Sequence, residues 1–484
     1  MQQSSLGSYA SPAGIRVASL TGSEITSLLV LLCASAILTG LLLSVFVPPA
    51  YVFGVMALIF GVVSVLVRWP YGALLAIVIA SLMPHITIGL GSWNVRPEHY
   101  VIGLVSVVLC VRWLKGERAQ IRWNAADKLL IAFVAWNYIT SALMSPDPKM
   151  TLRWALLNNL VILPYWLLRY LVSDERTLRW VFKVFVLVGI AESAYAVISF
   201  VSQRLFGTSF GVDVGQYGAF GGTYGTLVEA NLLGSYSGCL AIILLVLYFS
   251  SDRRPPWLLG GIVLVTAALI VSLARAALVG FGFVAIVLLF LGVRRGFVRA
   301  RKLLPLGLTL ALFLVPIAAS GGRNFVERFT NLSEQGIEDE TTMGRIMALS
   351  AAFQDIPQHP VFGTGTGSFA LTLDDERVLA ILGESRPWIG NPVIRILHDT
   401  GVLGLVLFGL VAVYIAKQAK RAIAYGAYRI EIIALLAGCL VYAIAFMSAD
   451  GTMLAFFWVH LGILASAVVL MNNNNLDGVT QAER

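Results

Sequence analysis

Long apolar runs separated by short polar segments form the pattern of the chain between residues 27 and 471. An α-helix of roughly 17–25 apolar residues crosses a bilayer, so each run predicts a span. Roughly 12 to 14 transmembrane helices are expected, because the short runs 71–83 and 99–111 are tilted, re-entrant or not spans at all. The candidate spans are 27–47, 51–67, 71–83, 99–111, 129–144, 154–172, 180–203, 229–250, 257–274, 276–293, 303–319, 399–416, 430–447 and 452–471.

The composition excludes a soluble protein. Hydrophobic residues make up 58% of the 484 residues and charged residues only 12%, about half of the usual charged share. The predicted fold class is therefore all-α: a polytopic integral membrane protein with one long, partly helical periplasmic loop. The four cysteines lie inside apolar runs without CxxC spacing, which predicts neither disulfides nor a metal site.

Positive charge in the loops predicts the orientation. The formal net charge is +8, and most Lys and Arg residues fall in cytoplasmic loops if both termini are cytoplasmic. This topology accounts for the basic excess, so no nucleic acid partner is expected. The predicted parts are a cytoplasmic tail (1–26), an N-terminal transmembrane bundle (27–319), a large periplasmic loop (320–398), C-terminal transmembrane helices (399–471) and a cytoplasmic tail (472–484).

The loop 320–398 has recognisable local signals. It contains six Arg, ten Asp or Glu and no Lys, which places it outside the cytoplasm. The apolar spacing of 343–356 predicts a helix with Thr342 as its N-cap and Pro357 as its end. A second, short helix is predicted for 374–382.

The end of this loop leads into the next span. Asn391 and Pro392 are typical of the N-cap and first residue of a helix, which is expected to run straight into the span 399–416. Between the loop helices, residues 359–369 form a glycine-punctuated turn.

Three arginines at the predicted outer face are candidate anion ligands: Arg275, Arg345 and Arg395. An Arg near bilayer depth costs at least a few kcal/mol unless it is paired or hydrated, so it is a functional candidate. Arg395 stacks with Asn391 and Asp399 at intervals of four residues. Convergent guanidinium groups beside a helix N-terminus suit a diphosphate. Ordinary pairing of these arginines with loop carboxylates is the alternative.

A second outer segment, 206–226, has seven glycines and five aromatic residues. This composition suits sugar stacking, and it equally suits an interfacial aromatic belt. Glu229 and Asn231 stand at the head of the following span, where they bind substrate or cap the helix. Glu192, deeper in its span, is expected to have a partner or a watery cavity.

Motifs for nucleotides and metals are absent from the sequence. The glycine turn lacks the Gly-Lys-Ser/Thr of a P-loop, and no GxGxxG follows a predicted strand. No pair of histidines has zinc-ligand spacing. The sequence therefore predicts no metal and no cofactor.

The chain resembles the O-antigen ligase/polymerase family of bacterial membrane glycosyltransferases. The family pattern has an arginine helix, then Pro-x-x-Gly-x-Gly-x-x-x-Phe, then an Asn-led helix that ends in acid-x-Gly-x-x-Gly. The matching segments are Gly344-Arg345, Pro360 to Phe369, Asn391 to Gly404, the Ser272–Arg275 hairpin, and Gly222-Thr223 through Glu229-Ala230-Asn231.

The resemblance implies a donor, an acceptor and a location. Such proteins pass a glycan from undecaprenyl diphosphate to a hydroxyl of the lipid A core or of another glycan, at the outer face of the bacterial inner membrane. Ligation and polymerisation both fit. Arginine charges would stabilise the lipid diphosphate leaving group without a metal.

One departure from the pattern concerns the base. The family usually has His immediately before the loop Asn, and Gly390 stands there in this chain. Either another residue has become the base, with His398 beside Asp399 as first choice, or the acceptor differs, or activity is lost. Two other functions stay open: a lipid-linked oligosaccharide flippase, for which Glu192 would matter most, and a non-catalytic partner in glycan assembly.

Overall fold

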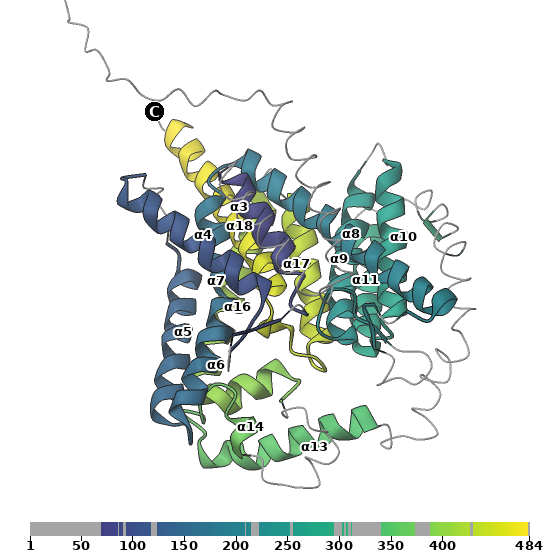
Figure 1. Cartoon of the computed structure of the whole chain (residues 1–484). Coiled ribbons are helices and arrows are strands. Elements are labelled where there is room, and N and C mark those ends of the chain that lie inside the picture. The colour runs from purple at the N-terminus through teal and green to yellow at the C-terminus, as the bar shows by residue number, and fades with distance from the viewer. Residues whose placement is uncertain are drawn as a thin grey trace, which may run out of the picture. The chain divides into compact units, whose positions relative to one another are not determined.

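The computed structural model describes the chain from Trp69 onwards with several gaps (Figure 1). The described residues are 69–85, 87–90, 93–117, 123–208, 210–213, 222–251, 255–294, 303, 306–307, 311, 340–372, 388–425 and 429–482. The predicted spans 27–47 and 51–67, most of 303–319 and the predicted helix 374–382 lie outside them. These residues all belong to one compact unit, Leu58–Arg484.

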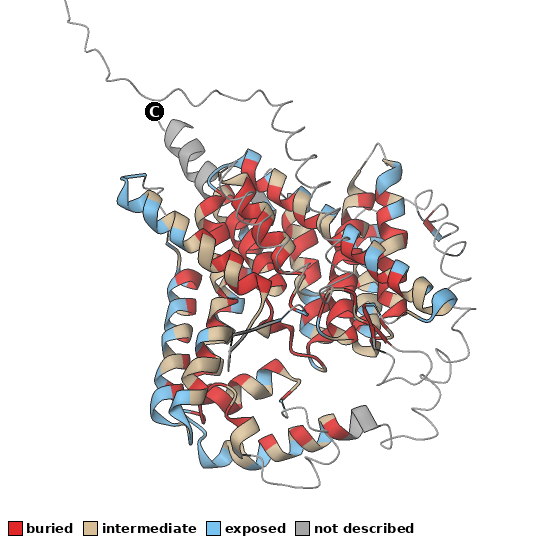
Figure 2. Ribbon diagram, in the orientation of Figure 1, coloured by how far each residue is buried: buried red, intermediate tan, exposed pale blue. Residues whose placement is uncertain are grey.

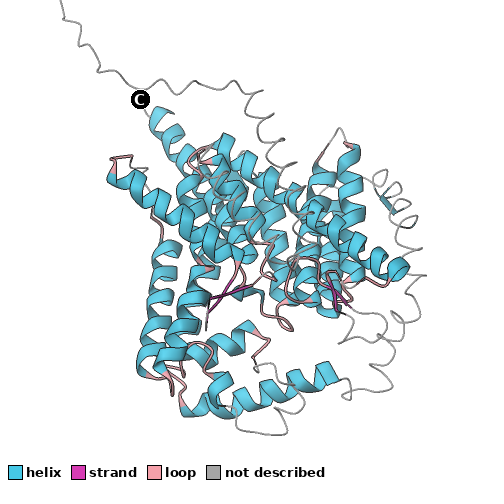
Figure 3. Cartoon of the chain, in the orientation of Figure 1, coloured by secondary structure: helices cyan, strands magenta, loops and turns pink. Residues whose placement is uncertain are grey.

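The described residues are almost entirely helical, apart from two short antiparallel strand pairs, β1 (Ile88–Leu90) with β2 (Trp93–Val95) and β3 (Val212–Asp213) with β4 (Gly222–Thr223) (Figure 3). The helices before the large loop are α3 (Tyr71–Ala80), α4 (Pro97–Leu114), α5 (Ala125–Leu143), α6 (Pro148–Leu160), α7 (Leu163–Leu171), α8 (Glu175–Phe206), α9 (Ala230–Ser250), α10 (Pro256–Val271) and α11 (Arg275–Arg294). Those of the loop and after it are α13 (Glu340–Asp355), α14 (Phe369–Thr372), α16 (Pro392–Tyr425), α17 (Arg429–Ala445) and α18 (Ala455–Ala482).

Several of these helices are suited to a bilayer. Five of the described helices, α4, α8, α9, α11 and α16, are long and apolar enough to cross it, and α3, α10, α17 and α18 are shorter apolar helices. Helices satisfy their own backbone hydrogen bonds, which hydrocarbon cannot do. The all-α, polytopic membrane fold predicted from the sequence is confirmed.

Helix α9 lies in the core of the bundle, where buried residues concentrate (Figure 2). It packs against α17, α10 and α11. A Cβ added at Gly238 of α9 would lie 3.2 Å from Val441 Cγ1, and one added at Gly280 of α11 would lie 3.2 Å from the Val441 carbonyl oxygen. Small residues therefore allow close packing of these helices, as is usual in lipid.

Three local predictions need correction. The run 154–172 is two helices, α6 and α7, because the chain turns at Val161 and Ile162 and restarts with Pro164, which lacks a backbone N–H. Helix α13 begins before Thr342, so Thr342 is not its N-cap. Helix α16 is not one continuous helix into the predicted span 399–416, because Gly401 interrupts it with non-helical dihedral angles.

Candidate functional site

The interruption of α16 organises one end of the molecule. Gly401 has φ 65° and ψ −171°, so carbonyl groups just before it lose their helical partners. Backbone groups of the glycine turn, residues 359–369, take their place. Thr364 N donates to His398 O (3.0 Å), Gly365 N to Asp399 O (2.9 Å) and Val402 N to Pro360 O (2.9 Å). These bonds fix the glycine turn on α16.

Two glycines are required by this contact. A Cβ at Gly363 would lie 2.5 Å from the carbonyl carbon of Asp399, and a Cβ at Gly401 would lie 2.2 Å from the carbonyl oxygen of Val361. Both glycines also have positive φ, which disfavours residues with a Cβ. The glycine spacing of the two motifs therefore reflects the packing of two backbone segments against each other.

The opposite side of the glycine turn contacts α5 and α6. Thr366 N donates to Ser141 Oγ (3.0 Å), and a Cβ at Gly367 would lie 2.5 Å from Trp154 Cε3. Trp136 of α5 donates its indole N–H to the carbonyl oxygen of Thr400 (2.8 Å). The turn is thus held between α5, α6 and α16.

Asp399 is buried at the centre of this arrangement, with 1% of its surface exposed. Its Oδ2 accepts from Gly367 N (3.1 Å) and from Arg395 Nη1 (3.5 Å). Its Oδ1 lies 3.1 Å from Nδ1 of His398. The predicted contact between Arg395 and Asp399 is confirmed, and the carboxylate connects α16 to the glycine turn.

His398 is also buried, with its ring between two acidic side chains. Nδ1 faces Asp399 and lies 3.3 Å from Thr364 Oγ1. Nε2 lies 3.5 Å from Asp355 Oδ2, at the C-terminal end of α13. The edge of the ring meets Phe369. His398 therefore connects α13 with α16, and its nitrogen atoms face protein groups on both sides.

Arg395 is held by carboxylates rather than presented to an open surface. Its Nε is paired with Asp450, and its Nη2 donates to Thr452 Oγ1 (3.0 Å). Asp450 in turn accepts from the backbone N–H of Thr452 (2.9 Å). Together with Asp399, Asp450 offsets the guanidinium charge, and separating such a nearly buried pair is costly.

Asn391 caps α16 as predicted. Its Oδ1 accepts from Val393 N (3.0 Å) and Ile394 N (3.1 Å), which satisfies two free donors of the first turn. Its Nδ2 donates to the carbonyl oxygen of Met447 (3.2 Å). At the neighbouring Gly390, a Cβ would meet Ser448 O at 3.4 Å, which is an ordinary van der Waals contact.

A second cluster forms at the start of α9, where Glu229 lies immediately before the helix. Arg345 of α13 donates from Nη2 to Glu229 Oε1 at 3.2 Å, and Asn231 donates from Nδ2 to the same oxygen. The side chains are partly exposed, 36% for Arg345 and 22% for Glu229. The two residues are far apart in the sequence, and the fold brings them together.

The N-terminal part of α9 also contacts the connection between α10 and α11. A Cβ at Gly234 would lie 2.3 Å from Ala274 Cβ and 2.7 Å from Ser272 Oγ. Arg275, the first residue of α11, follows directly. Leu273 in this connection has φ 56°, an uncommon value for a residue with a Cβ. The Ser272–Arg275 hairpin therefore lies against the helix that begins beside Glu229.

Glu192 anchors the loop that leads to Glu229. Its carboxylate accepts from the backbone N–H of Thr226 (2.8 Å) and from the Thr226 hydroxyl (2.7 Å). On the other side of that loop, His85 N donates to Thr226 O (3.3 Å), and the His85 ring lies 4.7 Å from that of Tyr224. Burial lowers the pKa of His85. The partner expected for Glu192 is thus the loop itself.

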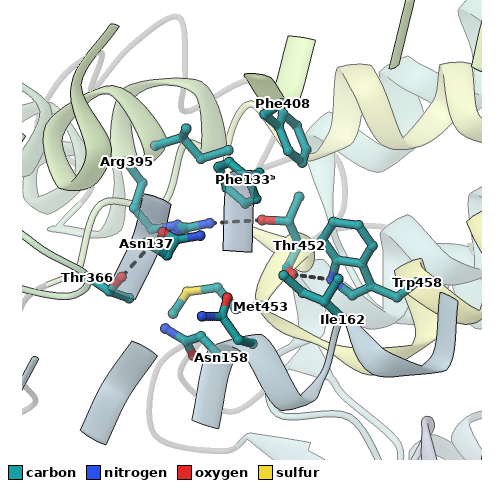
Figure 4. Close-up of a pocket in the computed structure, with 12 residues that line it drawn as sticks. Phe133, Asn137, Asn158, Ile162, Thr366, Arg395, Phe408, Thr452, Met453 and Trp458 are labelled. Carbon is teal, nitrogen blue, oxygen red and sulfur yellow. Dashed lines mark hydrogen bonds between the residues drawn. The ribbon is translucent and has the colours of Figure 1, made fainter. Parts of the chain in front are cut away.

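A small cavity lies beside Arg395, lined by side chains of α5, α6, α16 and α18 and by residues of the loops between helices (Figure 4). Its volume is about 30 Å³, which suits water-sized groups rather than a sugar ring. The lining residues are Phe133, Asn137, Asn158, Asn159, Ile162, Thr366, Arg395, Ile396, Phe408, Thr452, Met453 and Trp458. In Figure 4, Arg395 and Thr452 approach each other along one wall.

The structure sorts the predicted site residues into two clusters. Arg345, Glu229 and Asn231 form the first, with the hairpin that carries Arg275 packed against the same helix. Asn391, Arg395, His398 and Asp399 form the second, around the glycine turn. Sequence reasoning missed Asp355 and Asp450; the latter had a signal, since Asp450-Gly451-Thr452 interrupts two long apolar runs.

Among the described residues, no group of three or more His, Cys, Asp or Glu side chains is arranged to hold a metal ion. A comparison with protein families matches residues 260–409 to the family described as O-antigen ligase. This match supports the resemblance seen in the sequence, and it covers the hairpin at Ser272–Arg275, the glycine turn and the motif that ends at Gly404. No curated protein matches the chain.

Proposed function

Since residues 260–409 match the O-antigen ligase family, we propose that this chain transfers a glycan from undecaprenyl diphosphate to a hydroxyl acceptor. The acceptor is the lipid A core or another glycan. The reaction takes place at the outer face of the bacterial inner membrane, with both termini of the chain in the cytoplasm. The observation that carries the proposal is the meeting of Arg345, Glu229 and Asn231 at the start of α9.

This cluster has the properties that a lipid diphosphate requires. Glycosyl transfer leaves negative charge on the diphosphate as the bond to the sugar breaks, and guanidinium groups stabilise that charge. Arg345 is partly exposed, and Arg275 begins α11 on the hairpin that packs on α9. The N-terminus of α9 adds a favourable dipole for an anion. No step calls for a nucleotide or a metal.

The second cluster, around the glycine turn, holds α13 and thereby positions Arg345 of the first cluster. A small apolar cluster joins α13 to the segment before α16 through Ala348, Ala352, Phe369 and Ile389. His398 connects the end of α13 to α16 through Asp355. Helix α13 carries Arg345, so these contacts set where the arginine lies. Because His398 and Asp399 are buried and face protein groups, the geometry favours positioning roles for both rather than direct contact with an acceptor.

Arg395 and Asn391 take corresponding roles. Arg395 pairs with both Asp399 and Asp450, and Asn391 caps α16 and joins it to the segment after α17. Both residues shape the acceptor side of the site. The diphosphate role then belongs to Arg345 and Arg275.

Two other functions lead to different expectations. A flippase would use Glu192 along a path for substrate or ions, whereas Glu192 holds the loop before α9. A non-catalytic partner in glycan assembly is suggested by Gly390, which replaces the histidine of the family pattern. Both alternatives predict that the purified protein releases no product.

The test is acceptor-dependent release of undecaprenyl diphosphate by purified protein in detergent. The donors are the undecaprenyl-diphosphate-linked glycans extracted from the cells that make the protein, and the acceptors are the lipid and glycan fractions of the same cells. Arg345→Ala and Arg275→Ala should each lose about 10²–10³-fold in rate. Arg179→Ala is the matched control, because Arg179 forms an exposed pair with Glu175 at the far end of α8. No release by the wild type would contradict the proposal.

A further inference from the structure

Transfer to a hydroxyl needs a base within hydrogen-bond reach of the acceptor, and Gly390 offers no side chain for this purpose. The acidic residues around the two clusters differ in how exposed they are, and therefore in whether an acceptor can reach them. Asp399 and Asp450 are 1% and 2% exposed and are bonded to Arg395. Glu229 is 22% exposed at the side chain. Access therefore favours Glu229.

Position favours the same residue. Asp355 is also partly exposed, but it lies ten residues after Arg345 on α13, about 15 Å along the helix axis at the usual rise. It cannot act at a sugar whose diphosphate contacts Arg345. Oε1 of Glu229 lies 3.2 Å from Nη2 of Arg345. A sugar whose diphosphate contacts Arg345 therefore comes directly beside the Glu229 carboxylate.

The two oxygens of Glu229 have different surroundings. Among the residues that the structure describes, both hydrogen bonds to this carboxylate, from Arg345 and Asn231, go to Oε1. Asn231 keeps the side chain oriented from the first turn of α9. Oε2 is thereby left as the oxygen that can accept a hydrogen bond from an incoming hydroxyl.

We propose that Glu229 is the general base of the transfer reaction, and that Arg345 passes from Glu229 to the donor diphosphate when the donor binds. Without donor, Arg345 holds the carboxylate; with donor, the diphosphate attracts the guanidinium and Glu229 becomes available. Partly exposed pairs exchange readily, because water stabilises the separated charges.

The acceptor hydroxyl gives its proton to Oε2 of Glu229, and its oxygen uses a lone pair to form the new bond to the anomeric carbon. The bond between that carbon and the phosphate oxygen breaks, and its electron pair stays on the diphosphate. Arg345 and Arg275 stabilise that charge. Glu229 then returns the proton to water.

This inference rests on the proposed function, and an assay with azide as the acceptor distinguishes the loss of the base from the loss of transfer itself. Azide ion attacks the anomeric carbon without losing a proton, so it needs no base. Glu229→Gln keeps the size of the side chain and removes the base. We expect transfer to hydroxyl acceptors to fall about 10²–10⁴-fold. Azide should restore release of undecaprenyl diphosphate and give a glycosyl azide with the anomeric configuration of the normal product.

The controls distinguish a base from a binding group. Arg345→Ala should fail with both hydroxyl acceptors and azide, because it lacks the diphosphate contact. Glu175→Gln, in the exposed pair at the far end of α8, should behave as wild type. Glu229→Asp keeps a carboxylate on a shorter side chain and should retain more activity than Glu229→Gln, and its unfolding temperature checks the fold of this site.

Three outcomes contradict the inference. Transfer by Glu229→Gln within tenfold of wild type means that the base lies elsewhere. A Glu229→Gln protein that unfolds at the wild-type temperature but fails with azide means that Glu229 binds substrate instead. If the wild type releases nothing from the extracted donors, the proposed function itself fails, and the role of Glu229 fails with it.

Discussion

Replacing Gly401 by alanine tests how the glycine turn is fixed on α16. Gly401 has φ 65° and ψ −171°, a region that residues with a Cβ enter at a cost of about 1–3 kcal/mol. The added Cβ would also lie 2.2 Å from Val361 O and 2.6 Å from Phe362 N. These are backbone atoms, so relief requires the turn to move.

The magnitude follows from what that movement breaks. The hydrogen bond between Val402 N and Pro360 O (2.9 Å) spans this contact, and its loss costs about 0.5–1.5 kcal/mol. Together with the backbone strain, docking of the turn should weaken by about 2–4 kcal/mol. The matched control is Gly409→Ala in the same helix, where a Cβ meets nothing within 4 Å. That change should stabilise the protein by about 0.5–1 kcal/mol.

The assay combines thermal unfolding in detergent with limited proteolysis of the glycine turn. Gly401→Ala should lower the apparent unfolding temperature and speed cleavage within 359–369, whereas Gly409→Ala should do neither. Equal stability and equal cleavage of the two variants would refute the structural reading of the glycine motifs.

Three further predictions follow from the two clusters. Asp450→Asn leaves Arg395 without its main partner, so stability should fall by about 3–5 kcal/mol; in thermal unfolding, Glu175→Gln, from an exposed pair, should cost less than about 1 kcal/mol. Gly390→His should be tolerated, because a Cβ there comes no closer than 3.4 Å to Ser448 O; transfer should stay near wild type if Glu229 is the base, and a large rise would show that Gly390 marks a weakened base site. Glu192→Gln keeps an acceptor for Thr226 and should preserve much of the transfer rate. Glu192→Ala should reduce the rate, because it releases the loop before Glu229. A rate that neither substitution changes would show that this anchor does not matter for transfer.

The features that the sequence predicts well are those that depend on neighbouring residues. The bounds of α9 and α11 follow from continuous apolar runs, and Asn391 is a cap because the residues that it bonds are two and three positions away. The pairing of Arg395 with Asp399 follows from their spacing on one helix face. Each of these inferences needs only local information.

Contacts between distant segments could not be predicted in the same way. Glu229 and Arg345 meet because α9 and α13 converge. This convergence cannot be predicted from the hydropathy or the residue spacing of either segment. Asp450, in the segment between α17 and α18, pairs with Arg395 of α16, and this contact likewise depends on how the helices pack. The break at Gly401 could not be predicted, because this glycine lies in an otherwise helical pattern. The close approach of the Val361 carbonyl oxygen, from the glycine turn, accounts for a glycine at this position.

The buried state of His398 also depends on such contacts. Its position about two turns after Asn391 suggested a base, but the ring lies between Asp399 and Asp355 and makes a T-shaped contact with Phe369. Asp355 and Phe369 come from other segments of the loop. The choice between base and positioning residue therefore needed the fold.

The most direct measurement of the central claim is acceptor-dependent release of undecaprenyl diphosphate from the extracted lipid-linked glycans by purified protein in detergent. Wild type and Arg179→Ala should release it only when an acceptor fraction is present, and Arg345→Ala should lose at least about 10²-fold of that rate. Release that does not depend on an acceptor, or that Arg345→Ala retains in full, would contradict the assignment of this cluster to glycan transfer.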